Sequence, residues 1–339
     1  MRLFLLLVAV GAGALVAPPI SPKRARRRWR AAIAVAALVA GPLLTQACST
    51  FQVRRAQAER RQLGDLLYVE SAGPAAGPAM IFLPGMTATT TYWREAGALS
   101  LVDAGVRVLL VDELGFGRSP WPEGEYTLEV HLAAIERTLA SRRAQGDLVL
   151  IGHSFGAMLA AEYGARHPDT VRQVILFGTP LFRSEAEARL RVSEMSALAG
   201  LTARNSRLAR LVCFLHTAFL PAAARLAPRL RPDLPSTIAV DGTLHFWPSL
   251  RDSVENVVLR HPIEPAAKKL GGRLTFVHGR RDLITPLARI REVAAASGAA
   301  LVVTDDDHVS YWRDAARVIR ESLRAEQAKP DLPPGPRVP

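Results

Sequence analysis

Ser154 occupies the middle of a Gly-x-Ser-x-Gly pentapeptide at residues 152–156, a spacing that can expose a reactive hydroxyl. The apolar run Leu148–Ile151 leads directly into this pentapeptide, and the alanine-rich segment Ala157–Ala165 follows it. A serine on such a sharp strand-to-helix turn is held in a strained conformation with its hydroxyl above the sheet. The pattern therefore predicts a nucleophilic serine. The alternative is a glycine-rich turn that binds phosphate at a helix N-terminus, although the Gly-x-Gly-x-x-Gly spacing of dinucleotide sites is missing here.

A nucleophilic serine requires a base, and the chain offers eight histidines. His308 is the preferred candidate because it follows the predicted strand Leu301–Val303 and precedes the last predicted helix. Open α/β sheets carry their sites at this carboxyl edge. His153 is adjacent to Ser154 in sequence, so its ring is poorly placed to serve that hydroxyl. The remaining histidines fall in predicted helices, in an inserted region or at a strand end: His131, His167, His216, His245, His261 and His278. A solvated loop histidine at 308 is the alternative.

The base needs an acid to orient it, and Asp282 fits that role because it lies just past the predicted strand Leu274–Val277. Three consecutive aspartates at 305–307 compete for the role. Adjacent residues rarely orient each other's side chains, so we interpret those three as part of a solvated loop. Arg280 and Arg281 could pair with Asp282 instead, which is the structural alternative to a catalytic role.

Short apolar strands alternate with helical patterns through most of the chain, which indicates βαβ units and a parallel sheet. The predicted strands are Ala79–Leu83, Val106–Val111, Leu148–Ile151, Val171–Phe177, Leu274–Val277 and Leu301–Val303, and the predicted helices include Trp93–Ala104, Thr127–Ala144, Ala157–Ala165, a segment after Pro286, and Tyr311–Leu323. Residues 66–180 and 273–325 therefore form an α/β core. The helical, arginine-rich stretch 181–272 is an insertion, and residues 326–339 form a proline-rich tail that we expect to be disordered.

Composition and charge exclude several classes of protein. Hydrophobic residues make up 49% of the 339 residues and charged residues 22%, which is typical of globular proteins. The net charge of +12 is concentrated at +9 in residues 1–65, so the body is almost neutral and no nucleic-acid partner is expected. Cys48 and Cys213 are too few for a disulfide framework or a four-thiolate zinc site.

Residues 1–48 are predicted to form a targeting segment, and 49–65 a polar linker. The basic block at 23–30 precedes the short apolar run Ala31–Leu44, as in a secretory signal. The run ends near Cys48 in a sequence that resembles a bacterial lipoprotein processing site, except that Leu44 lies one position too far away. Two interpretations stay open: lipidation at Cys48, or an uncleaved membrane anchor. Both place the body outside the inner membrane. A translation start downstream of Met1 is a further hypothesis.

With these motifs, the chain resembles the α/β-hydrolase superfamily over residues 66–325. The stretch Leu83–Met86 resembles the loop that supplies one oxyanion-hole amide, here from Met86, although proline replaces the usual histidine. Phe155, directly after the serine, supplies the second amide in this family. The segment Asp112–Ser119 resembles the Asp-x-x-Gly-x-Gly-x-Ser loop of the family, which is a structural turn and not a catalytic one. The resemblance implies a mostly parallel, doubly wound sheet, and it implies that the insertion at 181–272 is a helical cap.

The resemblance further implies acyl transfer by a Ser154–His308–Asp282 triad that needs no metal and no organic cofactor. We expect a small-molecule carboxylic ester as substrate, with an apolar or lipid-derived acyl group possible, and membrane association through the N-terminal segment. An acyltransferase and a carbon–carbon bond hydrolase would use the same triad, and a non-catalytic binding protein on this fold is the remaining alternative. The sequence does not indicate the oligomeric state.

Overall fold

The computed structural model describes residues 62–74, 79–104, 107–144, 146–195 and 197–327, together with residues 58 and 60. The predicted targeting segment with its Cys48 lies outside the described residues, as does the chain beyond 327. Part of the predicted linker is described, and residues 58, 60, 62 and 63 are helical. The Arg60 guanidinium lies 3.6 Å from the ring centroid of Trp121. The C-terminal end of the predicted linker therefore packs on the body.

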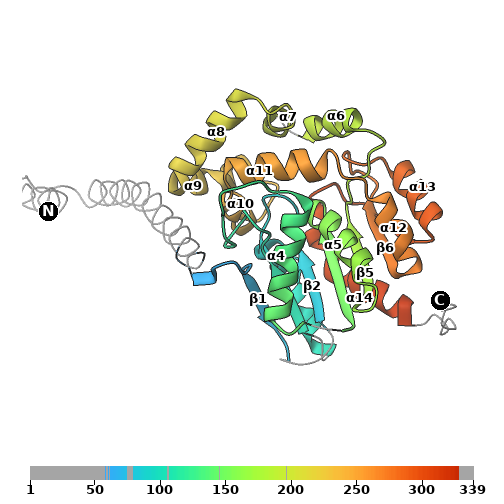
Figure 1. Cartoon of the computed structure of the whole chain (residues 1–339). Coiled ribbons are helices and arrows are strands. Elements are labelled where there is room, and N and C mark those ends of the chain that lie inside the picture. Colours follow the sequence, from blue (N-terminus) through green and yellow to red (C-terminus); the bar gives the residue numbers. More distant parts are fainter. Residues whose placement is uncertain are drawn as a thin grey trace, which may run out of the picture. The chain divides into compact units, whose positions relative to one another are not determined.

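Within the described residues, seven strands form one sheet in the order β1-β3-β2-β4-β5-β6-β7 (Figure 1). They are β1 (Val69–Ala72), β2 (Ala79–Leu83), β3 (Arg107–Val111), β4 (Leu148–His153), β5 (Val171–Phe177), β6 (Leu274–Gly279) and β7 (Ala300–Thr304). All neighbours pair in parallel except β1, which pairs antiparallel with β3. The predicted mostly parallel sheet is confirmed. Sequence analysis missed β1, because this short edge strand contains Glu70 and Ser71 and has no apolar run.

Helices cover both faces of the sheet, which confirms the doubly wound arrangement. They are α3 (Thr90–Glu95), α4 (Leu128–Ser141), α5 (Phe155–Arg166), α12 (Glu264–Leu270), α13 (Leu287–Ser297) and α14 (Ala315–Gln327), with 3-10 turns at Ala98–Ala104, Gly271–Arg273 and Ser310–Arg313. Alternation along β4 shows the two layers. Leu148 and Leu150 pack in a cluster with α4, α5, α12 and α13, whereas Val149 and Ile151 pack with α3 and α14.

Two predicted helices are divided in the structure. The predicted helix Trp93–Ala104 is α3 followed by a 3-10 turn, because Gly97 adopts φ +77° and ends the first helix. The last predicted helix begins with a 3-10 turn at Ser310–Arg313, and α14 continues to Gln327, two residues past the predicted end of the core. Both corrections change boundaries and leave the layer assignments unchanged.

A helical cap connects β5 to the rest of the core, as the resemblance implied. Its helices are α6 (Glu185–Met195), α7 (Ala197–Ala203), α8 (Arg207–Ala218), α9 (Leu220–Leu230), α10 (Ser236–Asp241) and α11 (Trp247–Ser253), followed by a π-helical turn at Val254–Val258. The predicted cap boundary at 272 is wrong, because α12 packs on α5 in the core. Parallel neighbouring strands are joined by a crossover connection that usually contains a helix, and α12 is such a helix between β5 and β6.

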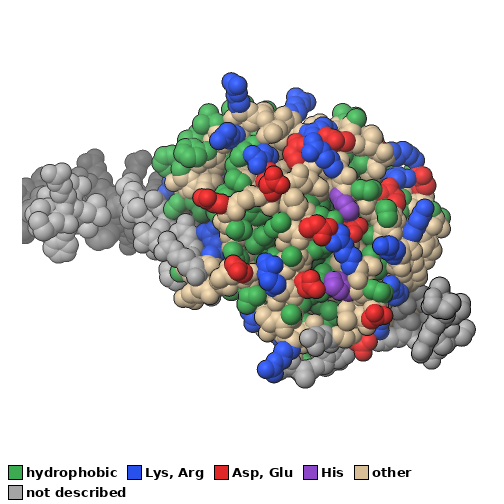
Figure 2. All heavy atoms as spheres, viewed as in Figure 1, with side chains coloured by type: hydrophobic (Ala, Val, Ile, Leu, Met, Phe, Trp, Pro, Cys, Tyr) green, Lys and Arg blue, Asp and Glu red, His purple; other side chains and the backbone are tan. Residues whose placement is uncertain are grey.

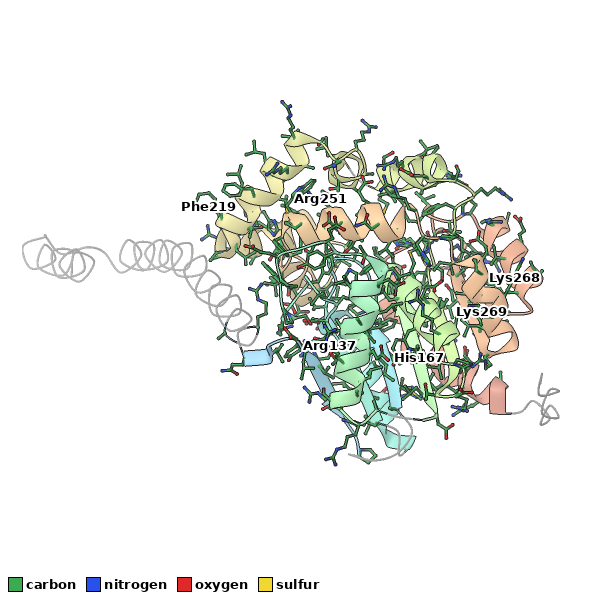
Figure 3. The ribbon with its side chains drawn as sticks, viewed as in Figure 1. Arg137, His167, Phe219, Arg251, Lys268 and Lys269 are labelled. Atoms are coloured by element: carbon green, nitrogen blue, oxygen red, sulfur yellow. The ribbon has the colours of Figure 1, made fainter. Side chains whose placement is uncertain are left out.

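The helices α8 and α9 present large apolar side chains to solvent. This set, which we call the α8–α9 surface, comprises Leu208, Leu211, Val212, Phe214, Leu215, Phe219, Leu226 and Leu230. Apolar side chains gather over these two helices at the upper left of Figure 2, and Figure 3 labels Phe219 at their outer edge. None of the described helices alone is long and apolar enough to cross a membrane. The α8–α9 pair meets that criterion only jointly, with a bend of 111° between the helices.

Candidate active site

Ser154 lies at the turn between β4 and α5 in a strained backbone conformation, with φ 51° and ψ −114°. A non-glycine residue rarely adopts a positive φ, and such strain is concentrated at functional sites. The Ser154 amide donates to the Phe177 carbonyl at 2.9 Å, which fixes the turn to β5. The side chain remains half-exposed. The local structure is therefore the nucleophile elbow predicted from the pentapeptide.

Two glycines allow this turn to form. A Cβ at Gly156 would lie 2.3 Å from the carbonyl oxygens of Leu83 and Pro84, so only glycine fits there. The Gly156 amide donates to the Pro84 carbonyl at 3.0 Å. A Cβ at Gly85 would lie only 2.7 Å from His153 Nδ1, and it would touch the Ser154 Cβ at 3.4 Å. The loop after β2 therefore packs directly against the serine turn.

The structure brings the three predicted triad side chains together from three separate loops. His308 Nε2 lies 2.9 Å from Ser154 Oγ, and His308 Nδ1 lies 2.9 Å from Asp282 Oδ2. Asp282 follows β6 and His308 follows β7, so both lie at the carboxyl edge where β4 ends. The Asp282 carboxylate is completely buried, and the His308 ring is 11% exposed. The serine and histidine are thus within reach of a ligand, and the acid is shielded from water.

The Asp282 carboxylate is held as an anion despite its burial. Burial alone would raise its pKa, but the adjacent His308 and further hydrogen bonds lower the pKa to about 2. Its Oδ1 accepts the Ile284 amide at 2.8 Å, and its Oδ2 accepts the Tyr311 hydroxyl at 3.1 Å. The Tyr311 oxygen in turn accepts the Gly279 amide at 2.8 Å. Sequence analysis missed Tyr311, because a single tyrosine at the start of a predicted helix carries no signal of this contact.

His153 supports the position of the predicted base. Its Nε2 donates to the backbone carbonyl of His308 at 2.7 Å. Its ring stacks on Tyr92 at a centroid distance of 4.9 Å and an interplanar angle of 9°. Burial and the nearby His308 lower the His153 pKa to about 3, so the ring is neutral at physiological pH. His153 therefore bonds to the loop of the base and not to the serine hydroxyl, in keeping with the sequence interpretation.

The competing acids and bases occupy other places. Asp305 is 91% exposed and pairs with Arg280 at 3.2 Å, and its carbonyl accepts the Arg281 guanidinium at 2.7 Å. Both arginines therefore bind Asp305 and leave Asp282 to His308. Asp306 accepts the Ser310 hydroxyl at 3.1 Å. Asp307 accepts the backbone amides of Val309 and Ser310, both at 3.0 Å. Hydrogen bonds to these aspartates hold the turn that carries His308. The turn is therefore more ordered than we expected for a solvated loop.

Four other histidines contact groups outside the triad. His131 bonds Ser253, His261 pairs with Glu162, His278 donates to the Thr285 carbonyl, and His167 stacks on Tyr163. The last two histidines, His216 and His245, lie together in the cap. None of these six is hydrogen-bonded to Ser154 among the described residues.

Two backbone amides are free to bind an oxyanion. Within the described part of the chain, the N–H groups of Met86 and Phe155 donate no hydrogen bond. Phe155 opens α5, so its N–H is among those that a helix leaves unsatisfied. Met86 follows Gly85, which packs on the serine turn. Phe155 directly follows Ser154, and Met86 belongs to the loop that packs against the serine turn.

The Asp112–Ser119 segment forms a buried turn that joins the core to the cap. The Asp112 carboxylate accepts the amides of Thr90 at 2.5 Å and Arg118 at 2.7 Å. Burial raises its pKa to about 6, although Arg118 opposes the rise. The Arg118 guanidinium reaches Asp241 of α10 at 3.1 Å. This segment has the structural role that the resemblance implied.

A strained serine after β4, an acid after β6 and a histidine after β7 define a doubly wound α/β protein with a serine–histidine–aspartate triad. A family model described as alpha/beta hydrolase fold matches residues 78–315. The chain therefore belongs to the α/β-hydrolase fold family.

Individual relatives match shorter stretches. The probable lysophospholipase BODYGUARD 1 of Arabidopsis thaliana is 33% identical over 107 residues, which are 30% of this chain and 23% of that protein. A 1-acylglycerol-3-phosphate O-acyltransferase of the same plant is 33% identical over 117 residues, 33% of this chain and 27% of that protein. The matched stretch thus spans about a quarter of the length of these relatives.

Solved structures share the fold at low identity. A structure described with the carboxylesterases of the thaumarchaeon Nitrososphaera gargenis superposes with a TM-score of 0.58 at 16% identity. The alignment covers 77% of this chain and 94% of that one. At this identity the likeness supports the fold alone.

Proposed function

We propose that this protein is a serine hydrolase that cleaves a carboxylic ester through an acyl-enzyme. The observation that carries the proposal is the continuous hydrogen-bonded path from Ser154 Oγ through His308 to the buried Asp282. The low pKa of Asp282 keeps this carboxylate ionised beside the imidazole, as its role requires. This property distinguishes the proposal from a non-catalytic binding protein.

The geometry supports two successive half-reactions. His308 Nε2 takes the Ser154 proton while Oγ attacks the carbonyl carbon, and the carbonyl oxygen becomes an oxyanion held by the amides of Met86 and Phe155. The ester C–O bond then breaks, and His308 returns its proton to the departing alkoxide. Water next attacks the acyl carbon while His308 takes its proton, the bond from that carbon to Ser154 Oγ breaks, and His308 returns the proton to Oγ. The products are a carboxylic acid, an alcohol and the free serine.

An apolar, lipid-derived acyl group is the substrate class that we propose. The α8–α9 surface exposes eight large apolar side chains on the cap, and Arg207 and Arg210 lie on the same helix. Such a combination of apolar side chains and cations is typical of segments that rest on a membrane. The relatives named a probable lysophospholipase and an acylglycerol-phosphate acyltransferase support lipid chemistry. We include in the proposal the membrane-associated, extracytoplasmic location predicted from the N-terminal segment.

Acyl transfer to an alcohol is the second candidate function, and it is favoured by the relative named an acyltransferase. It uses the same acyl-serine and differs only in the group that resolves it. Product analysis with a radiolabelled acyl donor and glycerol as competing acceptor separates the two. Free fatty acid as the main product supports hydrolysis, and acylglycerol as the main product supports transfer.

A panel of p-nitrophenyl esters from acetate to palmitate tests the proposal. We expect the full-length protein to hydrolyse them with a preference for longer chains, and we expect Ser154→Ala to lose at least about 10³-fold in kcat. Ser193→Ala is the matched control, because among the described residues that hydroxyl bonds just the Leu190 carbonyl of its own helix α6. Retained hydrolysis in Ser154→Ala would contradict the mechanism. A preference for acetate would contradict the substrate class and leave the mechanism intact.

A further inference from the structure

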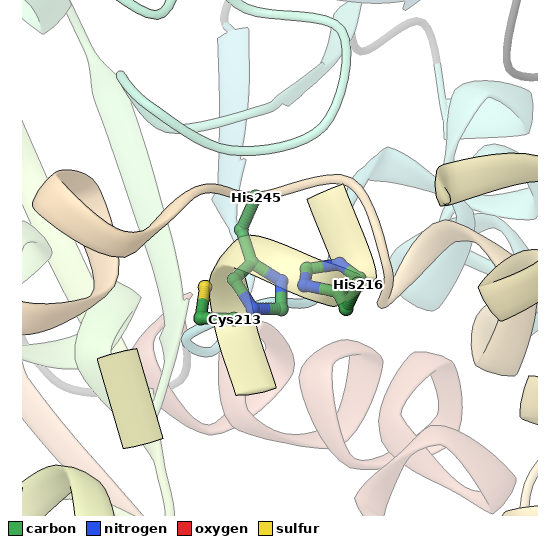
Figure 4. Close-up of side chains that lie close together, drawn as sticks. All are labelled: Cys213, His216 and His245. Carbon is green, nitrogen blue, oxygen red and sulfur yellow. The ribbon is translucent and has the colours of Figure 1, made fainter. Parts of the chain in front are cut away.

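Three side chains with metal-binding chemistry meet in the cap, apart from the triad. Cys213 and His216 lie one turn apart on α8, and His245 comes from the connection between α10 and α11 (Figure 4). Each residue offers one ligand atom, and these three atoms lie within 4.8 Å of one another. The Cys213 side chain is buried, and both histidines are partly exposed. A thiolate and two imidazoles form a donor set that Zn²⁺ prefers.

Both imidazoles are oriented in the way that metal-binding histidines usually are. His216 Nε2 donates to the Thr243 carbonyl at 2.6 Å, and His245 Nδ1 donates to the Gly242 carbonyl at 3.1 Å. These bonds fix the tautomers and leave His216 Nδ1 and His245 Nε2 as the nitrogens with free lone pairs. A backbone carbonyl on the second nitrogen holds the ring in place and raises its basicity toward a metal.

We propose that Cys213, His216 and His245 form a binding site for Zn²⁺ with a fourth position open to water. A tetrahedral zinc ion holds its ligand atoms about 3.5 Å apart, so closure requires movements of about 1 Å. On binding, the Cys213 S–H bond breaks, its proton passes to the solvent, and a sulfur–zinc bond forms. Sequence analysis predicted no metal site, because Cys213 and His216 lie about 30 residues from His245 and match no common zinc spacing.

A zinc ion at this position would join the cap to the core. Leu244, beside His245, accepts the Gly117 amide at 2.7 Å, and His245 itself forms a β-bridge with Phe116. Gly117 and Phe116 belong to the buried Asp112–Ser119 turn of the core. The α8 helix, by contrast, buries only Ala209 and Cys213. Coordination would therefore tie a weakly packed cap helix to a segment that is already fixed on the core.

The competing explanation is simple packing. Cys213 belongs to a small apolar cluster with Ala209 and Trp247, and the two imidazole rings lie 4.5 Å apart between centroids. A buried thiol beside two packed rings would need no metal. The two explanations differ in whether the thiol and both rings bind the same ion.

Titration of the full-length protein, prepared without a polyhistidine tag, with Co²⁺ and then Zn²⁺ distinguishes them. We expect one equivalent of Co²⁺ to give visible bands of tetrahedral cobalt and a near-ultraviolet thiolate-to-cobalt band, both lost when Zn²⁺ displaces it. Cys213→Ser and His245→Gln should each weaken binding by about 100-fold or more. Cys48→Ser and His167→Gln are the matched controls and should bind as the parent does.

Thermal unfolding provides a second readout that does not depend on colour. Saturating Zn²⁺ should raise the Tm of the parent and of both controls, and it should leave the Tm of Cys213→Ser and His216→Gln unchanged. Circular dichroism of these variants without metal serves as the control for folding and should match that of the parent. The proposal is overturned if the parent shows no thiolate-to-cobalt band, or if Cys213→Ser binds one equivalent as tightly as the parent.

Discussion

Two helices of twelve residues each, α5 and α8, show how differently the core and the cap are built. α5 buries ten consecutive residues, Phe155 to Gly164, between the sheet and its neighbours. α8 buries only Ala209 and Cys213, and its large apolar side chains, Phe214 among them, face outward. Burial of apolar surface stabilises α5 in a single position. α8 receives much less of this stabilisation.

This difference matches what each region does in our account. The triad needs three loops placed with sub-ångström accuracy, and the buried layer beneath β4, β6 and β7 supplies that rigidity. The cap presents the α8–α9 surface and the cluster of Cys213, His216 and His245, which we propose bind a membrane and Zn²⁺. The core thus holds the triad side chains in fixed positions, whereas the cap carries side chains that face outward.

We expect the largest effect, and the clearest contrast between core and cap, from substitutions of two buried aspartates. Asp282→Asn should lower kcat on a p-nitrophenyl ester by about 10⁴-fold, because an amide cannot hold the His308 tautomer and charge. Asp241→Asn in the cap should leave kcat within a few-fold and lower the Tm, because the ion pair between Asp241 and Arg118 is lost. Steady-state kinetics and thermal unfolding measure both. Equal losses of kcat in the two variants would remove the distinction between core and cap.

The ionised state of Asp282 in the core should also make the stability of the protein depend on pH. The Asp282 pKa falls from 3.8 in the unfolded chain to about 2 in the fold, so its stabilisation is present above pH 3.8 and is lost as the pH falls toward 2. This linkage amounts to about 2 kcal/mol. Between pH 6 and pH 2.5 we expect the free energy of unfolding of the parent to fall by about 1.5 kcal/mol more than that of Asp282→Asn, because Asp282 is only partly protonated at pH 2.5. Urea titrations across this range measure it, and parallel curves would contradict the assigned pKa.

The outward-facing cap surface gives an intermediate effect. Phe219→Ser combined with Leu230→Ser should raise KM for an ester carried in anionic vesicles by about 10-fold, because two apolar contacts with lipid are lost. The kcat and KM for a soluble ester should stay unchanged. Val130→Ser on the core helix α4 is the control, since Val130 is also exposed. An equal change in KM for the soluble ester would show that the double variant disturbs the site and not the surface.

We expect the smallest change in kcat from a substitution of His153. His153→Phe keeps a ring to stack on Tyr92 and removes the donor to the His308 carbonyl. Loss of one such bond corresponds to about a 10-fold decrease in kcat, with KM unchanged. His167→Phe is the control, because His167 packs on Tyr163 away from the triad. An unchanged kcat in His153→Phe would show that the base needs no such support.

The core and its site were largely predictable from the sequence, for a physical reason. Apolar runs before and after Ser154 predicted the strands of the sheet. Asp282 and His308 each follow one of these predicted strands, which predicted their position at the carboxyl edge. The contacts of Tyr311 and His153 could not be predicted, because they join residues whose spacing follows no helical or strand period. The same holds for His245 and Cys213, which meet only through the folding of the cap. The misplaced cap boundary arose because α12 has the same helical pattern as the cap.

Labelling of the full-length protein with a fluorophosphonate probe, read by intact mass and peptide mapping, tests the central claim most directly. The account predicts one adduct per chain, on the tryptic peptide Ala144–Arg166, absent in Ser154→Ala and slowed strongly in Asp282→Asn. An adduct on any other residue, or ester hydrolysis by a chain that the probe does not label, would contradict it.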